Sequence, residues 1–229
     1  MDNKKDNSDS LFELSRRLQR SSEISQKFVE LYWALMFSVT RMIESTFYRG
    51  RIELQEEAVL YFGCGTNFSS GVNSDLFAVH RYLKRRRRPD VYLTGVSTPI
   101  GLQNRFKGVV TEHVLEHMLP IDGHLVLCNL YKMLEPGGTI QISVPSPVRF
   151  IQCTEAGLSM DVIGINDIVY NYGHRFMYDE EALCSLLASA GFEEIEVNTL
   201  ENSPWSDFLS VDRQPQSIYV CAKKCPADT

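Results

Sequence analysis

A short apolar run that ends in a glycine turn constrains this chain more than any other feature. Residues 59–62 read Val-Leu-Tyr-Phe, and Gly63-Cys64-Gly65 follows them directly. Glycines placed there let the backbone turn tightly and approach a ligand without a Cβ in the way. The pattern predicts a buried strand with a ligand site at its carboxyl end. A glycine pair after a strand also occurs in plain turns, so other features have to support the prediction.

Strands and helices alternate along the rest of the chain. Short apolar runs predict strands at 72–74, 91–93, 108–110, 140–144, 195–197 and 218–221, and periodic stretches predict helices at about 122–134 and 179–190. This alternation predicts an α/β fold with a doubly wound, mainly parallel sheet. Ligands of such sheets bind beyond the carboxyl ends of the strands. We therefore expect the polar residues that follow the strands to converge in space.

The N-terminal part has a different pattern. Residues 1–10 are polar, and residues 11–48 carry apolar side chains at three- and four-residue steps, which predicts a helix. We divide the chain into an N-terminal tail and helical extension, residues 1–50, and a main domain, residues 51–229. The helical extension either packs against the main domain, which the pattern favours, or serves as a mobile lid or the contact of a homodimer.

Composition and charge exclude several classes of protein. The formal net charge of −6 argues against a nucleic-acid partner, because nucleic-acid binders usually carry a basic surplus. The basic run at residues 84–88 fits a solvated loop better than a nucleic-acid contact. No apolar run approaches the ~20 residues that span a membrane, and residues 1–10 contain no apolar signal core. The six cysteines form no CxxC pair. We expect reduced thiols, a cytoplasmic location and no membrane contact.

An acidic residue, Asp75, ends the second predicted strand. A carboxylate there is placed to accept hydrogen bonds from ribose hydroxyl groups. It follows Gly65 by ten residues, whereas a dinucleotide-binding fingerprint leaves about 20. The short interval counts against a nicotinamide-dependent oxidoreductase.

Four motifs follow one another along the chain: Phe62–Gly65 with Gly71–Asp75, Val109–His117, Tyr131–Pro145, and Gly173–Asp179 continued through Ala190-Gly191-Phe192. These motifs resemble those of the class I S-adenosylmethionine-dependent methyltransferases, and in particular of the methyltransferase type 11-like branch with its shortened first crossover. Together they span roughly residues 58–197, and the combination is specific although each motif alone is weak. The resemblance implies a Rossmann-like, seven-stranded sheet whose last strand is antiparallel, with S-adenosyl-L-methionine as the cofactor.

The resemblance also implies where the cofactor binds. It places the cofactor over the glycine turn, with the ribose at Asp75 and the adenine against residues 96–98. The implied cofactor-binding residues are Phe62, Gly63, Cys64, Gly65, Asn73, Asp75, Ser97, Thr111 and Glu112.

The methyl acceptor is expected to be a small molecule or a biosynthetic intermediate. The resemblance places His113 opposite the transferred methyl group, where an imidazole takes a proton from a hydroxyl or amine or only orients an ionised acceptor. His174 is the second catalytic candidate. Residues 145–172 form an irregular stretch longer than an ordinary connection, which predicts a binding loop or lid. Candidate acceptor-binding residues are Arg149, Tyr170, Tyr172 and Arg175; arginine suits a carboxylate or phosphate, although solvated arginines and lid-packing aromatics are the alternative.

A possible metal set lies near the fourth predicted strand. His113, Glu116 and His117 stand three and four residues apart and share one helical face. Their spacing allows a metal site. Leu-Glu-His also occurs in metal-free relatives, where the glutamate and the histidine brace the helix. We expect no bound metal.

Three positions differ from the family pattern. They are Tyr61 before the glycine turn, Val96 in an adenine-flanking segment without an acidic residue, and Lys107 at the fourth strand. These differences keep open a second class of function, a non-catalytic methyltransferase-fold protein that binds or stabilises a partner enzyme. The intact glycine turn and Asp75 favour the enzyme.

Overall fold

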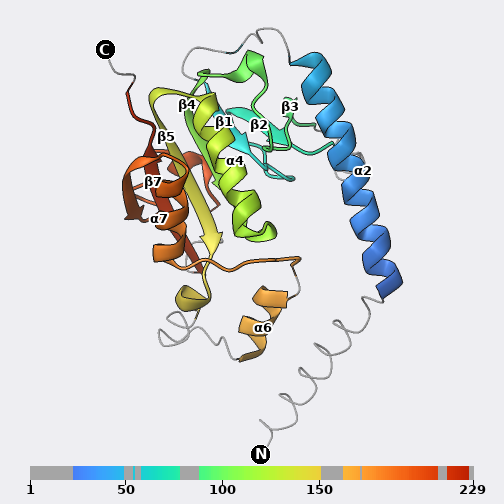
Figure 1. Cartoon of the computed structure of the whole chain (residues 1–229). Coiled ribbons are helices and arrows are strands. Elements are labelled where there is room, and N and C mark those ends of the chain that lie inside the picture. Colours follow the sequence, from blue (N-terminus) through green and yellow to red (C-terminus); the bar gives the residue numbers. More distant parts are fainter. Residues whose placement is uncertain are drawn as a thin grey trace, which may run out of the picture.

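A seven-stranded sheet forms the centre of the molecule (Figure 1), with the strand order β3-β2-β1-β4-β5-β7-β6. The computed structural model describes residues 23–48, 54, 58–77, 88–150, 162–170, 172–210 and 216–226, without the side chains of 23–29, 162–164 and 167. The strand order reverses between β1 and β4, which is where ligands of doubly wound sheets bind.

The strands occur where the apolar runs predict them. Their bounds are β1 Val59–Phe62, β2 Val72–Asp75, β3 Val91–Tyr92, β4 Phe106–Glu112, β5 Leu134–Pro145, β6 Glu193–Asn198 and β7 Ser217–Lys223. The pairs β1–β2, β1–β4, β2–β3 and β4–β5 are parallel. β7 runs antiparallel to both β5 and β6. The prediction of a doubly wound α/β sheet of seven strands with an antiparallel last strand is confirmed.

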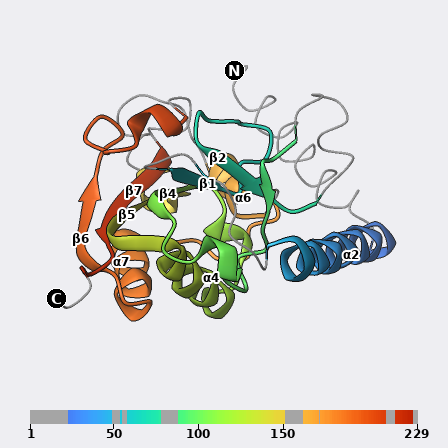
Figure 2. The same cartoon turned by 90° about the horizontal axis from the view of Figure 1, so that it is seen from above.

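Two helices cover one face of the sheet, α4 (Pro120–Met133) and α7 (Glu180–Ser189), as Figure 2 shows. Strand residues such as Leu60 and Ile140 are fully buried beneath them and form the main core. The carboxylate of Asp179 caps the first turn of α7 by accepting a backbone hydrogen bond. Both helices agree with the sequence prediction to within a few residues.

The opposite face carries a smaller apolar cluster. Val59, Tyr61 and Val110 contact Trp205 and Phe208 from the segment that follows β6. Neighbouring residues of a strand therefore point to different layers, as the two-residue period of a strand requires. This alternation decides which polar strand residues reach which face. The described residues also form three short 3₁₀ helices, η1 Ile100–Leu102, η2 Leu115–His117 and η3 Ser206–Phe208.

The N-terminal helix α2 (Glu23–Phe47) lies beside the β3 edge of the sheet (Figure 1). It confirms the helical prediction over those residues, and residues 1–22 lie outside the described part of the chain. Thr40 and Glu44 are buried, whereas Leu31 and Leu35 are exposed. Neither α2 nor any other helix within the described residues combines the length and apolar character needed to cross a bilayer.

The stretch 145–172, predicted as irregular, contains the helix α6 (Val162–Tyr170). The prediction was wrong for these residues, because Ile165, Ile168 and Val169 continue a helical spacing of apolar residues. The carboxyl end of β5 points toward α6 (Figure 1), so this helix lies beyond the ligand-binding edge of the sheet.

Two composition-based expectations are tested only in part. Residues 84–87 of the basic run lie outside the described residues, and Arg88 is exposed. The five cysteines in the described part of the chain are free thiols, and Cys153 lies outside it.

Candidate active site

The glycine turn after β1 is tightly fixed to β2. Gly63 and Gly65 have φ angles of 74° and 57°, which favour glycine. The backbone N–H groups of Gly63 and Cys64 both donate to the carbonyl oxygen of Ser74 at 2.9 Å. A Cβ on Gly63 would lie 2.4 Å from Cγ2 of Val114. The turn therefore lies directly against the segment that follows β4.

Two neighbours of these glycines, Phe62 and Cys64, have buried side chains. Phe62 belongs to the main core, and Cys64 belongs to the cluster on the other face. Their side chains serve packing, so the part of this turn that is open to a ligand is glycine backbone.

Asp75 lies at the end of β2 and braces the glycine turn. Its Oδ2 accepts a hydrogen bond from the backbone N–H of Gly65 at 2.8 Å, and its Oδ1 accepts one from Leu76 at 2.7 Å. The carboxylate thus fixes the shape of the turn and carries a negative charge at the carboxyl ends of β1 and β2. Thr111 pairs with Phe62 in the β1–β4 register and is buried at the same edge.

The side chains of Asn73 and Glu112 are both held by neighbouring groups of the scaffold. The Asn73 amide bonds to Ser69, Gly71 and Asp90, which ties it into the scaffold of β2. The Glu112 carboxylate accepts hydrogen bonds from the backbone and the hydroxyl of Ser210, at 2.8 and 2.7 Å. Glu112 points away from Thr111 because adjacent strand residues face opposite sides of a sheet. Both residues therefore have partners within the protein, and their assignment as cofactor ligands stays a prediction.

Helix α2 brings a carboxylate to residues 94–97, which overlap the segment that is predicted to flank the adenine and that has no acidic residue of its own. Glu44 is 4% exposed and accepts hydrogen bonds from the backbone N–H and the hydroxyl of Thr94, at 2.6 and 2.9 Å. It also accepts one from Ser97 at 3.3 Å, and Arg41 donates to the Ser97 hydroxyl. Ser97, a predicted cofactor ligand, is therefore held between two charged residues of α2. Sequence reasoning missed Glu44.

We expect Glu44→Ala to detach α2 from the β3 edge. The variant removes the acceptor for the buried Thr94 N–H, and hydrogen bonds to charged groups contribute about 1.5–3 kcal/mol each. A loss of about 3 kcal/mol would lower the melting temperature of a chain of this size by roughly 6–12 °C. Glu30→Ala, at an exposed position of the same helix, is the matched control. Equal melting temperatures for the two variants would contradict this anchoring role.

The backbone takes an unusual conformation directly after β4. His113 has a φ of 55°, although it is not glycine, and such strain clusters at functional sites. Its Nε2 lies 2.9 Å from Oγ of Ser217, and its Nδ1 lies 3.5 Å from Oε1 of Glu116. Since Val114 touches Gly63, His113 lies beside the glycine turn. The two ring nitrogens are directed at a hydroxyl and a carboxylate, as in an oriented general base.

The second predicted catalytic residue, His174, is held against η2 by the surrounding backbone. The N–H groups of Arg175 and Phe176 donate to the carbonyl oxygen of Glu116, at 2.7 and 3.2 Å. The Nδ1 of His174 donates to the carbonyl oxygen of Ile168 in α6. Burial lowers the pKa of His174, and the nearby His117 lowers it further, against the effect of the Ile168 hydrogen bond.

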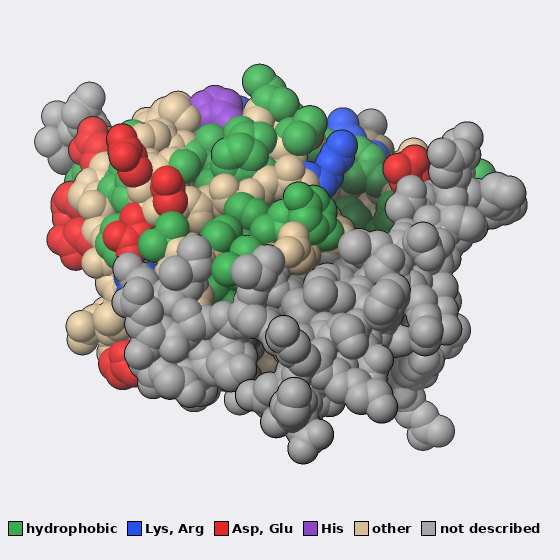
Figure 3. All heavy atoms as spheres, turned by 90° about the horizontal axis from the view of Figure 1, so that it is seen from below, with side chains coloured by type: hydrophobic (Ala, Val, Ile, Leu, Met, Phe, Trp, Pro, Cys, Tyr) green, Lys and Arg blue, Asp and Glu red, His purple; other side chains and the backbone are tan. Residues whose placement is uncertain are grey.

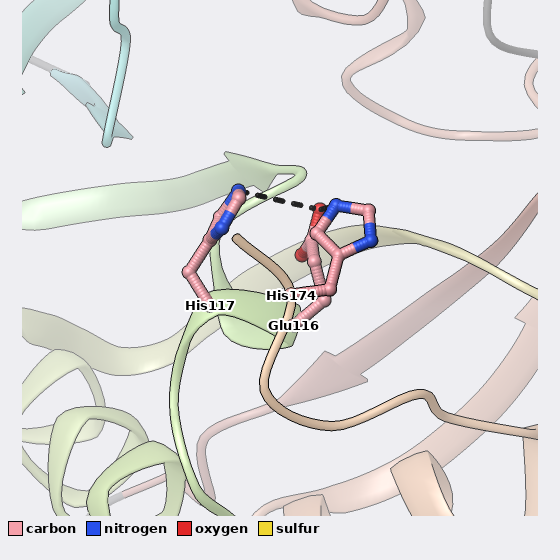
Figure 4. Close-up of side chains that lie close together, drawn as sticks. All are labelled: Glu116, His117 and His174. Atoms are coloured by element: carbon pink, nitrogen blue, oxygen red, sulfur yellow. Dashed lines mark ion pairs between the residues drawn. The ribbon is translucent and has the colours of Figure 1, made fainter. Parts of the chain in front are cut away.

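Glu116 is the residue on which these histidines converge. It is fully buried, and its Oε1 lies 3.5 Å from Nδ1 of His113, 4.0 Å from Nε2 of His117 and 3.9 Å from Nε2 of His174. Figure 4 shows the rings of His117 and His174 beside this carboxylate. Burial, together with the Glu116 charge, raises the pKa of Tyr178 to about 12, which keeps that phenol protonated. The sequence allows Glu116 as a metal ligand beside His113 and His117 and favours it as a brace for the helix.

The predicted acceptor-binding residues divide into two groups. The ring of Tyr172 lies against that of His174, with 5.8 Å between the centroids. Arg175 follows His174 in the segment that is hydrogen-bonded to η2. Tyr170 ends α6 and is 65% exposed. Arg149 instead forms an ion pair of 2.6 Å with Glu180 at the start of α7. Seen from below, much of the described surface is hydrophobic, with a histidine at its rim (Figure 3).

Comparison with known proteins supports the class that this fold and site define. A family model described as "Methyltransferase domain" matches residues 53–197. A search of curated protein sequences found no match. An S-adenosylmethionine-dependent methyltransferase from Thermotoga maritima has a TM-score of 0.52 at 20% identity, over 88% of this chain and 99% of that protein.

Two other solved structures are similar at lower scores. An S-adenosylmethionine-dependent methyltransferase from Archaeoglobus fulgidus has a TM-score of 0.49 at 16% identity, over 83% of this chain and 94% of its own. Phosphoethanolamine N-methyltransferase 2 from Haemonchus contortus, in complex with S-adenosylmethionine, has a TM-score of 0.48 at 13% identity. That comparison covers 81% of this chain and 52% of the nematode protein.

The strand order and the braced glycine turn define a class I methyltransferase fold. The chain belongs to the methyltransferase domain family, which confirms the resemblance found in the sequence. The cofactor of this family and fold is S-adenosylmethionine. The residues present fit it, because glycines in the left-handed region form the turn after β1 and because the Asp75 carboxylate ends β2 beside that turn, 2.8 Å from the Gly65 N–H.

Proposed function

We propose that this protein is an enzyme that transfers a methyl group from S-adenosylmethionine to a small-molecule acceptor, such as a biosynthetic intermediate. The observation that carries the proposal is the contact between Gly63 and Val114. It joins the turn that suits the cofactor to His113, the candidate base. The expected cofactor-binding turn and the candidate base would thus lie next to each other at the switch point of the sheet.

The cofactor, when bound, supplies an activated methyl group. The chain's own residues would bind and orient it. The glycine backbone at Gly63 and Gly65 admits close approach, Asp75 offers a carboxylate to the ribose hydroxyls, and Ser97 lies beside the expected adenine position. Holding two reactants in a fixed geometry converts an encounter in solution into a local reaction, which is the main catalytic effect in this proposal.

His113 would take the proton of an acceptor hydroxyl or amine. The Glu116 carboxylate, 3.5 Å from Nδ1, favours a proton on that nitrogen and leaves the lone pair on Nε2. The Ser217 hydroxyl lies 2.9 Å from Nε2, so an acceptor would replace Ser217 as its partner. An acceptor that is already ionised would need His113 only for orientation.

The acceptor would bind under the segment that carries Tyr172 and Arg175. Arg175 is exposed beside the histidine cluster, and a guanidinium there suits a carboxylate or phosphate on the acceptor. Arg149 would contribute only after its ion pair with Glu180 opens.

The proposal also includes two expectations about the protein as a whole. One is a cytoplasmic location, which the free thiols support, and the other is a homodimer through the N-terminal helix.

The test of this proposal is calorimetric titration with S-adenosylmethionine and S-adenosylhomocysteine, together with thermal melts. We expect dissociation constants of about 1–100 µM. A ligand at 100 times its dissociation constant adds about 2.7 kcal/mol of stability. That amount would raise the melting temperature by roughly 5–11 °C for a domain of this size. Absence of both heat and a melting shift would overturn the enzyme proposal in favour of a non-catalytic scaffold.

A further inference from the structure

The cluster around Glu116 brings together three ligand atoms of the kinds that metal ions prefer. Nε2 of His117 and Nε2 of His174 lie 4.0 and 3.9 Å from the same oxygen of Glu116. All three atoms lie within 4.8 Å of one another, and they face a common point in Figure 4. His174 comes from a segment 57 residues beyond His117, so the set exists only in the folded chain.

Backbone carbonyl groups fix which nitrogen of each ring carries the proton. Nδ1 of His117 lies 3.3 Å from the carbonyl oxygen of Gly173, and Nδ1 of His174 contacts that of Ile168. A carbonyl oxygen only accepts, so each Nδ1 is the donor and each Nε2 presents its lone pair toward Glu116. Histidines that bind metals almost always donate their other N–H to a carbonyl or carboxylate group in this way.

These groups lie where one cation can contact all of them. Two nitrogen lone pairs and a carboxylate oxygen converge where Glu116 is fully buried. The ring centroids of His117 and His174 are 5.0 Å apart, so the two rings approach the same carboxylate from neighbouring positions. One divalent cation can bind both lone pairs and the carboxylate oxygen together.

We propose that Glu116, His117 and His174 form a binding site for a divalent transition-metal cation, of which zinc is the best match. Two histidines and one glutamate form the protein ligand set of several catalytic zinc sites. Tetrahedral zinc bonds of about 2.0–2.2 Å would place the ligand atoms roughly 3.4 Å apart. The two nitrogen–oxygen separations, 4.0 and 3.9 Å, would therefore contract by about half an ångström, and the exposed His117 side chain has room to move.

The surroundings suit such a site. His113 approaches the same Glu116 oxygen at 3.5 Å and orients the carboxylate. The His117 side chain is 42% exposed, which gives a cation an entry path, whereas that of His174 is 6% exposed. Three protein ligands leave a coordination position for water or for an oxygen or nitrogen atom of an acceptor. This proposal departs from the expectation of a metal-free site, which weighed only residues that are close in sequence.

The test is a calorimetric titration of the chelator-treated full-length protein with Zn²⁺, in the absence of S-adenosylmethionine. We expect one Zn²⁺ per chain with a dissociation constant of about 1 µM or lower. His117→Ala and His174→Ala should each weaken binding at least tenfold, because each removes one of three ligands. His124→Ala is the matched control, since His124 contacts Ser189 and Cys128 outside the cluster. It should bind Zn²⁺ as the wild type does.

Substitution of Co²⁺ identifies the ligand atoms. Nitrogen and oxygen ligands give visible absorption bands without the intense thiolate-to-cobalt charge-transfer bands that cysteine ligands produce. Failure to saturate at one Zn²⁺ per chain, wild-type affinity in both His117→Ala and His174→Ala, or thiolate bands with Co²⁺ would each overturn the proposal. Because no cofactor or acceptor is present, the outcome does not depend on the proposed methyl transfer.

Discussion

Gly63→Ala is expected to be among the most damaging single substitutions in this protein. Its Cβ would lie 2.4 Å from Cγ2 of Val114, where an ordinary contact is above 3.4 Å. The residue would also have to keep a φ of 74°, which costs about 1–2 kcal/mol outside glycine. Overpacking adds about 1–3 kcal/mol. We therefore expect a loss of about 2–5 kcal/mol in the free energy of unfolding, measured by chemical denaturation.

A second glycine separates the effect of the positive φ from the effect of the clash with Val114. Gly137 has a φ of 79°, and a Cβ there would meet nothing within 4 Å. Gly137→Ala should therefore cost about 1–2 kcal/mol, which is the backbone term alone. The double variant Gly63→Ala, Val114→Ala removes the clashing methyl groups and should be more stable than the sum of the single variants predicts. Equal losses for Gly63→Ala and Gly137→Ala would mean that the turn does not press on Val114.

The parts of the site that could be predicted from the sequence depend on residues close together in the chain. The glycine turn follows a buried strand, and Asp75 ends the next one, so their meeting follows from the parallel pairing of β1 and β2. The same local reasoning would also have predicted that the side chains of Thr111 and Glu112 lie on opposite faces of the sheet. Adjacent residues in a strand face opposite sides, and only one of the two can lie on the side of the main core.

The contribution of Glu44 could not be predicted in this way. The apolar pattern of α2 identifies a helix, but a glutamate within that pattern is indistinguishable from one that faces water. Its role depends on where the whole helix docks, and that docking places it against Thr94 and Ser97. An element outside the sheet thus brings a carboxylate to the segment that the sequence predicts to flank the adenine.

The histidine cluster shows the same limit. The spacing of His113, Glu116 and His117 is visible in the sequence, but the approach of His174 depends on the path of the chain through α6 and back to η2. The N–H groups of Arg175 and Phe176 donate to the carbonyl oxygen of Glu116 and hold the returning segment in place. These bonds join residues far apart in the chain, so no local sequence pattern predicts them. Two residues predicted as separate catalytic candidates are therefore partners of one buried carboxylate.

The second large effect is expected at Asp75. In the proposed function its carboxylate binds the ribose hydroxyls, and it also accepts the Gly65 N–H at 2.8 Å. Hydrogen bonds to charged groups contribute about 1.5–3 kcal/mol each, and 1.4 kcal/mol corresponds to a tenfold change in affinity. We expect Asp75→Ala to weaken S-adenosylmethionine binding about 100-fold in a calorimetric titration, and to abolish the melting shift that the cofactor causes.

Asp90 provides the control that isolates the cofactor contact from the bracing of the backbone. Its Oδ2 accepts hydrogen bonds from the backbone and side-chain N–H groups of Asn73, at 2.8 and 3.1 Å, so Asp90→Ala also removes an aspartate that braces β2. Because Asp90 precedes β3 rather than ending β2, its loss should lower the melting temperature without changing cofactor affinity more than about threefold. Asp75→Asn keeps an acceptor for Gly65 but loses the charge, and it should bind with intermediate affinity. Wild-type affinity in Asp75→Ala would show that the carboxylate only shapes the turn and that the ribose is bound elsewhere.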